Sequence, residues 1–336
     1  MTRPPVACLV ALALVLPLTG SACGENGSGV PGQGAATTDS AARTTADRSE
    51  SPDDRSGTPN DVPDTTRVIL VTGSTGGLGR EVARRLAAGG ARVIVHGRDV
   101  ERGTGLVREI ETSGAGSARF FRADFAHLDS VRALADSVRR HYDRLDVLVN
   151  NAGILLGTAE RPVSSDGHEL HFQVNYLAGY LLTHELLPLL KRSAPARVVN
   201  VSSRSADPID FDDVMLESGY SAGRAYGQSK LAQIMFTFTL AERLEGSGVT
   251  VNALHPASLM DTDLVKDIGM EPRSSVAEGA RAVMHLIDGE DVGTGHYYRR
   301  MERARAPEAQ AYDGEARARL DSISRELTGL PPAGGS

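Results

Sequence analysis

The sequence has little of what several classes of protein require. Cys8 and Cys23 are its only cysteines, and both precede the region that reads as folded, which excludes a disulfide framework or a cysteine metal site there. The formal net charge is −7 and no basic stripe is present, so no nucleic-acid partner is expected. The nine histidines are scattered, and the neighbours His168 and His171 lack a carboxylate at ligand spacing, so no metal site is expected either.

The apolar run from Val6 to Leu18 is too short to span a bilayer comfortably. Because Arg3 precedes it, residues 1–23 are predicted to be an export signal. The segment Leu18–Cys23 resembles a bacterial lipoprotein signal, in which the cysteine after small residues is lipidated and becomes the new N-terminus. It departs from that pattern at Gly20, where an aliphatic residue is usual, and the chain has no twin-arginine pair.

Residues 24–64 contain almost no aliphatic side chains and are rich in Gly, Ser, Thr, Asp, Ala and Pro. Such a composition cannot bury a core, so this segment is predicted to be a disordered linker. Signal, cysteine and linker together predict a membrane tether through a lipid on Cys23, with the rest of the chain outside the cytoplasm. The alternative is a start codon placed too far upstream, which would leave a cytoplasmic protein.

The rest of the chain is organised around the sequence RVILVTGSTGGLG, residues 67–79. Its apolar run, Val68–Val71, predicts a buried parallel strand, and residues 81–88 predict a helix. Glycines between a strand and a helix N-terminus let the backbone approach a pyrophosphate, and the free helical N–H groups favour its negative charge. An ordinary glycine-rich turn is the alternative, because the spacing is not that of the commonest dinucleotide fingerprint.

Strand and helix patterns alternate over residues 65–300. Further strands are predicted at residues 91–95, 118–121, 146–149, 196–201, 249–254 and 295–298, and further helices at 100–111, 128–138, 168–190, 226–244 and 276–287. Six or seven strands separated by helices predict a single α/β domain with a doubly wound parallel sheet, a Rossmann fold. Residues 301–336 are predicted to form a charged helical tail.

The end of the second predicted strand bears on the choice of cofactor. Dinucleotide-binding folds often place an acidic residue there for the ribose hydroxyls, but this chain has Gly97 and then Arg98. A cation favours the 2′-phosphate, so NADP(H) is expected over NAD(H); a solvated loop arginine is the alternative. Asp124 follows the third predicted strand, where an adenine ring could lie.

Tyr226 and Lys230 are four residues apart in a predicted helix and share a face. A phenol is a poor acid or base near neutral pH, but an ammonium beside it favours the phenolate and lowers its pKa. Ser203 follows the fifth predicted strand, where its hydroxyl can bond a reacting oxygen. The pair alone is a weak signal; after a glycine turn, an Asn-Asn-Ala-Gly and a Ser-Ser in this order, it is strong.

Residues 68–264 therefore resemble the short-chain dehydrogenase/reductase family in its single-domain branch. The shared motifs are T-G-x-x-x-G-x-G at 72–79, N-N-A-G at 150–153, a helical asparagine, a serine after the fifth strand, and Y-x-x-x-K at 226–230. The long loop from 203 to 226, with its Phe-Asp-Asp at 211–213, resembles the retinol-dehydrogenase-like and WW-domain-oxidoreductase-like members.

The resemblance implies a role for each matching residue. Tyr226 would give or take the proton, and Lys230 would lower its pKa and bind the nicotinamide ribose. Ser203 would polarise the substrate oxygen, and Asn175 would support a water that connects Lys230 to bulk solvent. The implied cofactor-binding residues are Gly73, Ser74, Thr75, Gly77, Leu78, Asp124, Asn151 and Thr262, in addition to Tyr226 and Lys230.

Two positions are open in this assignment. A one-residue slip would make Ser202 the catalytic serine, although the second serine of such a pair usually carries the role. The chain has Pro256-Ala257 where the family usually has Pro-Gly, and Thr262 lies one residue later than the usual threonine.

The implied activity is hydride transfer between NADP(H) and a carbonyl or a primary or secondary alcohol. A dinucleotide-binding sensor without turnover is the alternative, although it would not need the intact Ser203, Tyr226 and Lys230. A sugar-nucleotide epimerase needs a glycine spacing that this chain lacks. Apolar residues such as Ile154 and Met260 could line a pocket for a lipophilic substrate or belong to the core. Pairing of helices in the family suggests a homodimer or homotetramer.

Overall fold

The computed structural model of this chain describes residues 66–334. The predicted export signal, Cys23 and the linker at 24–64 lie outside the described residues, so these remain predictions. Within residues 66–334, none of the helices combines the length and the apolar character that a bilayer span requires.

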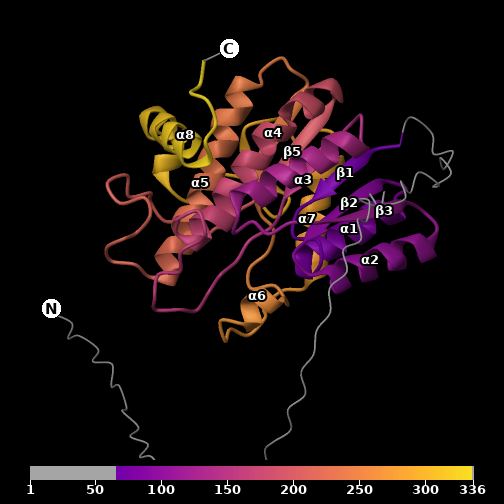
Figure 1. The fold of residues 1–336 in the computed structure, drawn as a ribbon, viewed down its shortest axis with the longest axis horizontal. Coiled ribbons are helices and arrows are strands. Elements are labelled where there is room, and N and C mark those ends of the chain that lie inside the picture. The colour runs from indigo at the N-terminus through magenta and orange to yellow at the C-terminus, as the bar shows by residue number, and fades with distance from the viewer. Residues whose placement is uncertain (1–65, 335–336) are drawn as a thin grey trace, which may run out of the picture. The chain divides into compact units, whose positions relative to one another are not determined.

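One eight-stranded sheet forms the centre of the fold, with the strand order β3-β2-β1-β4-β5-β6-β7-β8 (Figure 1). The strands are β1 (Val68–Val71), β2 (Arg92–Gly97), β3 (Ser117–Arg122), β4 (Val147–Asn150), β5 (Ala196–Val201), β6 (Val249–His255), β7 (His296–Arg299) and β8 (Glu302–Ala304). All neighbours are parallel except β7 and β8. The order reverses between β1 and β4, the point at which such sheets bind ligands beyond the carboxyl ends of their strands.

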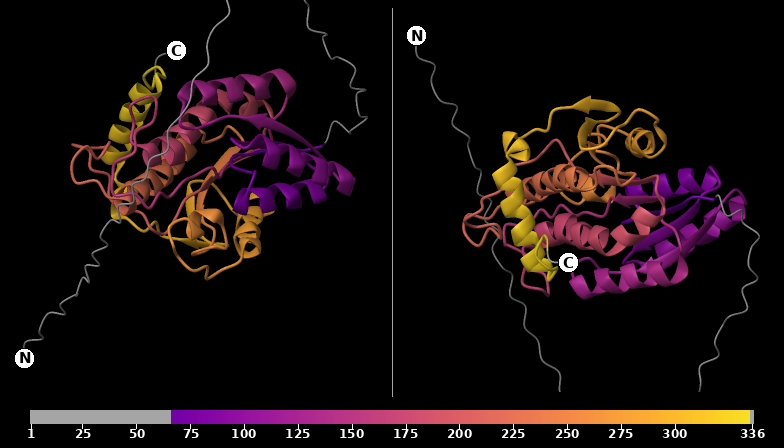
Figure 2. Two further views of the ribbon diagram at one scale, coloured as in Figure 1. Left: turned by 60° about the horizontal axis from the view of Figure 1, so that its bottom comes forward. Right: turned by 90° about the horizontal axis from the view of Figure 1, so that it is seen from above.

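Helices cover both faces of the sheet, as the views in Figure 2 show. They are α1 (Gly77–Ala88), α2 (Val100–Ser113) and α7 (Val276–Asp288) on one face, and α3 (Leu128–His141), α4 (Ala178–Arg192) and α5 (Ala222–Arg243) on the other. In β1, Val68 and Leu70 enter the core on the α3–α5 side, and Ile69 and Val71 enter the core on the α1–α7 side. Burial on both faces explains the unbroken apolar run, and the predicted doubly wound sheet is confirmed.

The helix predicted at 168–190 does not begin as an α-helix in the structure. Its first part is the π-helical segment η1 (Phe172–Leu177), and α4 follows directly. A π-helical turn widens the backbone by one residue and is frequent at functional sites. Asn175 lies in this segment.

The segment predicted as a helical tail belongs to the body of the domain. After β8 and the short η2 (Ala309–Tyr312), helix α8 (Gly314–Thr328) packs on α5 (Figure 1). The buried carboxylate of Asp321 accepts hydrogen bonds from Tyr180, Arg243 and Arg325. Burial alone would raise the pKa of Asp321, but these hydrogen bonds lower it to about 2. The carboxylate that holds α8 on the domain is therefore charged near neutral pH.

Candidate active site

The glycine turn after β1 forms a cradle that side chains would fill. Gly73 and Gly77 have φ angles of +63° and +50°, which favour glycine. A Cβ atom on Gly73 would lie 2.8 Å from the Cα of Ala152, and one on Gly79 would collide with the carbonyl of Gly73. Gly76, the N-cap of α1, has no side chain to bond the first N–H groups of the helix, so these are available to an anion. The cradle therefore fits a dinucleotide pyrophosphate.

Thr72 and Asn151 join the glycine turn to the loop after β4. The Thr72 hydroxyl accepts hydrogen bonds from the backbone N–H groups of Asn151 and Ala152, both at 2.9 Å. The Asn151 amide donates to the carbonyls of Thr72 and Gly73 at 2.8 and 3.2 Å. Asn151 was predicted to lie under the ribose, and the structure places its amide in the support of the turn.

His96, the last side chain of β2, supports the same turn and was missed by the sequence analysis. Its Nδ1 accepts from the N–H of Gly73 at 3.1 Å, and its Nε2 lies 3.3 Å from the carbonyl of Ala123. Burial lowers the pKa of His96 to about 4, so the ring is neutral, accepting at Nδ1 and donating at Nε2. The backbone N–H of His96 donates to the hydroxyl of Ser74 at 3.0 Å, which turns this predicted cofactor residue toward β2. The sequence did contain a signal for this role, because His96 is a polar residue at the end of an otherwise apolar strand.

Three predicted residues, Thr75, Arg98 and Asp124, follow the carboxyl ends of the neighbouring strands β1, β2 and β3. Thr75 packs on Gly97, where a Cβ atom would lie 2.5 Å from its methyl carbon. Arg98 is exposed, and its carbonyl accepts from Arg122 at 3.3 Å. Asp124 accepts from the backbone N–H of Ala126 at 3.0 Å, within the turn that follows β3.

The segment after β6 folds over the glycine turn. Thr262 precedes α6 (Asp263–Lys266), and its methyl carbon lies 3.1 Å from where a Cβ atom on Gly77 would be. Arg102 in α2 donates to Asp263 at 3.0 Å, which ties α6 to the same region. Leu78 is buried toward α7, 3.2 Å from a Cβ atom placed on Gly279.

The two serines after β5 have different surroundings. The Ser202 hydroxyl donates to the carbonyl of Lys230 at 2.7 Å and is buried against α5. The Ser203 hydroxyl accepts from the backbone N–H of Ser205 at 3.1 Å and acts on the phenol of Tyr226, whose pKa it lowers; the Ser203 carbonyl accepts from Tyr297 at 3.2 Å. Ser203, not Ser202, thus faces the phenol.

Lys230 lies beside the ring of Tyr226 and makes its hydrogen bonds to other groups. Burial raises the pKa of Tyr226, and the Ser203 hydroxyl opposes this rise. The Lys230 Nζ lies 5.5 Å from the centre of the Tyr226 ring and donates to the carbonyl of Val201 at 3.1 Å and to Gln233 at 2.9 Å. Burial lowers the pKa of Lys230 to about 7, so its charge is partial near neutral pH.

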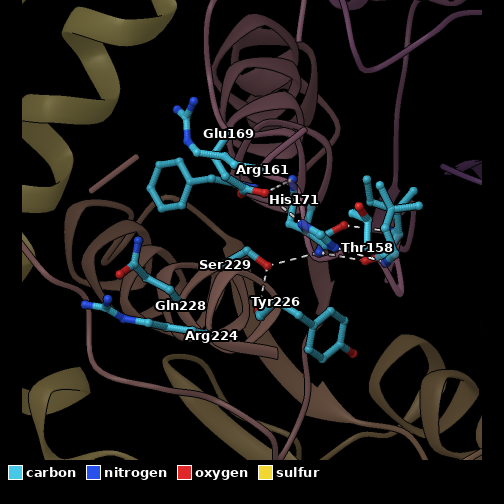
Figure 3. A network of polar contacts seen from close by, with 12 residues as sticks. Thr158, Arg161, Glu169, His171, Arg224, Tyr226, Gln228 and Ser229 are labelled. Carbon is cyan, nitrogen blue, oxygen red and sulfur yellow. Dashed lines mark hydrogen bonds and ion pairs between the residues drawn. The ribbon is translucent and has the colours of Figure 1, made fainter. Parts of the chain in front are cut away.

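Asn175 connects the loop after β4 to α5. Its Oδ1 accepts from the N–H of Ile154 at 2.7 Å, and its Nδ2 donates to Ser229 at 3.0 Å. The Ser229 hydroxyl donates to the carbonyl of Tyr226 at 2.7 Å, and Figure 3 shows the Tyr226 phenol extending away from this network. A Cβ atom on Gly153 would lie 3.2 Å from Asn175 and 3.5 Å from the Lys230 Nζ, so Asn175 and Lys230 border the same point.

A buried Glu169–His171 pair holds the same loop from behind and was also missed. The carboxylate of Glu169 accepts from the Nδ1–H of His171 at 2.7 Å, and the Nε2 of His171 accepts from the N–H of Leu156 at 3.0 Å (Figure 3). The partner that His171 seemed to lack is the residue two positions before it. Among residues 66–334, no group of three or more His, Cys, Asp or Glu side chains could hold a metal ion.

The chain is similar in sequence to known dehydrogenases. Residues 67–272 match the model of a family described as short chain dehydrogenase. Retinol dehydrogenase 11 of Homo sapiens is 37% identical over 279 residues, which cover 79% of this chain and 86% of that protein. Retinol dehydrogenase 13 of Mus musculus is 37% identical over 291 residues, which cover 80% of this chain and 86% of that protein.

Solved structures share the fold. The Pseudomonas aeruginosa RhlG/NADP active-site complex has a TM-score of 0.58 and 30% identity, over 69% of this chain and 94% of that chain. A short chain dehydrogenase from Burkholderia cenocepacia J2315 in complex with NADP has a TM-score of 0.57 and 29% identity, over 70% of this chain and 95% of that chain.

The buried lysine gives a testable pH dependence of stability. Because burial lowers the pKa of Lys230 from 10.5 to about 7, the unfolded chain binds more protons than the folded chain between these values. Wild type should therefore gain about 2 kcal/mol of unfolding free energy from pH 7 to pH 9 relative to Lys230→Met. Urea unfolding at several pH values measures this, with the exposed Lys191→Met as control. Parallel pH profiles for wild type and Lys230→Met would contradict it.

Proposed function

The chain belongs to the short chain dehydrogenase family, whose members are NAD(P)-dependent oxidoreductases, and on that premise we propose that it interconverts a carbonyl and an alcohol with NADP(H). The observation that carries the proposal is the placement of the Ser203 hydroxyl by the phenol of Tyr226, whose pKa it lowers. It lies on the carboxyl edge of the sheet that also bears the glycine cradle.

In the proposed reaction each residue has one task. NADP(H), when bound, supplies or accepts the hydride. The glycine turn and the first N–H groups of α1 hold the pyrophosphate, and Ser203 donates a hydrogen bond to the substrate oxygen. Tyr226 gives its proton to that oxygen in reduction or takes it in oxidation. Its raised pKa keeps the phenol protonated before substrate binds, which suits the direction of reduction.

Lys230 and Asn175 support this proton transfer. With a pKa of about 7, Lys230 can exchange a proton with solvent at working pH, and it borders the same point as Asn175. We propose that the two residues position a water there and that Lys230 binds the nicotinamide ribose. Thr262, over the glycine turn, is proposed to contact the nicotinamide side of the cofactor.

Two observations support a preference for NADP(H) over NAD(H). Arg98 is exposed at the end of β2, where an acidic residue would read the ribose hydroxyls. Among the related structures, the Pseudomonas aeruginosa and Burkholderia cenocepacia proteins are complexes with NADP. Thr75 and Asp124, at the neighbouring strand ends, are proposed to complete the adenosine site.

The cellular location and the oligomeric state of the protein are also proposed and not observed. A lipid on Cys23 would tether the domain outside the cytoplasm, and a mis-assigned start would leave it cytoplasmic. Cell fractionation separates these, and recovery only from the cytosol would exclude the tether. Any homodimer or homotetramer that pairs through α5 must use the surface that α8 leaves uncovered.

Removal of the Tyr226 hydroxyl tests the activity. Tyr226→Phe should lower kcat for NADPH-dependent reduction of an aldehyde by roughly 100-fold or more, because the proton donor is lost. The dissociation constant for NADPH, measured by its fluorescence, should change little. Full activity of Tyr226→Phe would contradict the assigned role. A wild type that binds NADPH but turns over no carbonyl in a broad screen would favour the sensor.

Removal of the Arg98 guanidinium tests the cofactor preference. Arg98→Ala should raise the dissociation constant for NADPH about ten-fold, the value of one charge-assisted hydrogen bond, and leave that for NADH unchanged. The matched control is Arg108→Ala, an exposed arginine further along α2. Equal weakening for both cofactors, or none for either, would remove Arg98 as the reader of the 2′-phosphate.

A further inference from the structure

Two arginines lie beside the proposed site without a role in the reaction. Arg204 directly follows Ser203, and Arg299 is the last residue of β7. β6 lies between β5 and β7, and His255, its last residue, is in register with Arg299. All three residues therefore stand at the carboxyl edge of the sheet, where the proposed substrate reacts.

The face of the sheet to which Arg299 points follows from the strand pattern. Successive side chains of a strand point to opposite faces, and Tyr297 enters the core on the α5 side whereas Tyr298 enters the core on the α7 side. Arg299 thus shares the face of Tyr297, whose hydroxyl bonds the carbonyl of Ser203. This is the face on which Tyr226 lies.

The electrostatic effects agree with this placement. Burial, together with the charges of Arg204, Arg299 and Arg300, lowers the pKa of His255 to about 4. Arg204 and Arg299 also act on Tyr297, against the rise in pKa that burial causes. Arg300 instead acts on Glu278 at the start of α7, on the other side of the sheet.

Arg204 and Arg299 have no carboxylate partner within the described part of the chain. Neither makes an ion pair or a side-chain hydrogen bond there, whereas Arg243 and Arg325 are both bonded to Asp321. Glu302 is opposite Arg299 in the β7–β8 register, yet it forms no ion pair with it. The two exposed guanidinium groups therefore leave positive charge at the rim of the site, which attracts an anion.

We propose that Arg204 and Arg299 bind a carboxylate of the substrate, so that the enzyme acts on aldehydes, ketones or alcohols that carry an acid group. A guanidinium fits a carboxylate with paired hydrogen bonds, and both arginines stand at the carboxyl edge of the sheet, Arg204 next to Ser203 and Arg299 on the face of Tyr297. This inference rests on the proposed function, because it assigns the substrate class of the same site.

A pair of aldehydes that differ in charge tests the inference on the full chain. The probes are 4-carboxybenzaldehyde and its neutral methyl ester, each reduced with NADPH. Wild type should show a kcat/KM at least ten-fold higher for the acid. The double variant Arg204→Gln/Arg299→Gln should lose this preference, because the value for the acid falls toward that for the ester. Arg303→Gln, from the same hairpin but bonded to His296, should keep it.

A binding measurement separates this inference from the proposed function. The complex of the enzyme with NADPH is titrated with 4-(hydroxymethyl)benzoate and with its methyl ester, alcohols that NADPH cannot reduce, and cofactor fluorescence is followed. Tighter binding of the acid that the double variant loses supports the carboxylate site, even if neither aldehyde is turned over and the proposed reaction fails. Equal binding of acid and ester by wild type, or a preference that survives in the double variant, overturns it.

Discussion

The hydrogen bonds between Thr72 and Asn151 join two loops that leave the sheet where its strand order reverses. Gly73 packs directly on the backbone of Ala152, so the loops cannot separate without opening the glycine turn. The second loop continues to Ile154, which Asn175 holds through its backbone. The cradle for the cofactor and the proposed proton-transfer site are therefore parts of one framework, and a disturbance of either loop should reach both.

Burial, more than charge pairing, sets the protonation states inside this framework. It lowers the pKa of His96 to about 4 and that of Lys230 to about 7, and it raises the pKa of Tyr226. The interior of the site thus relies on neutral or weakly charged groups, which stabilise a developing charge through oriented dipoles. Full positive charge is confined to the rim, where Arg98 and Arg299 would read the ends of the cofactor and substrate.

The order of motifs was enough to predict the doubly wound sheet and the glycine turn after its first strand, because both depend on local sequence and on where parallel strands end. His96 and the Glu169–His171 pair could not be found in this way. His96 and His171 also bond backbone N–H groups of the loops after β1 and β4, which only the folded chain brings near. The hydrogen bonds of the Lys230 ammonium were not predictable for a related reason, since one acceptor is a carbonyl of β5, which only the folded chain brings near.

The π-helical segment Phe172–Leu177 has a consequence for the length of the chain as well as its composition. A π turn holds one residue more than an α turn, so the residues on either side can keep the faces they would have in a regular helix. Loss of one residue here would remove the π turn and change which side chain of this segment faces Ile154 and Ser229, the two partners of Asn175, while α4 keeps its apolar side on the sheet. The number of residues in this buried turn, and not only their chemistry, therefore sets where Asn175 lies.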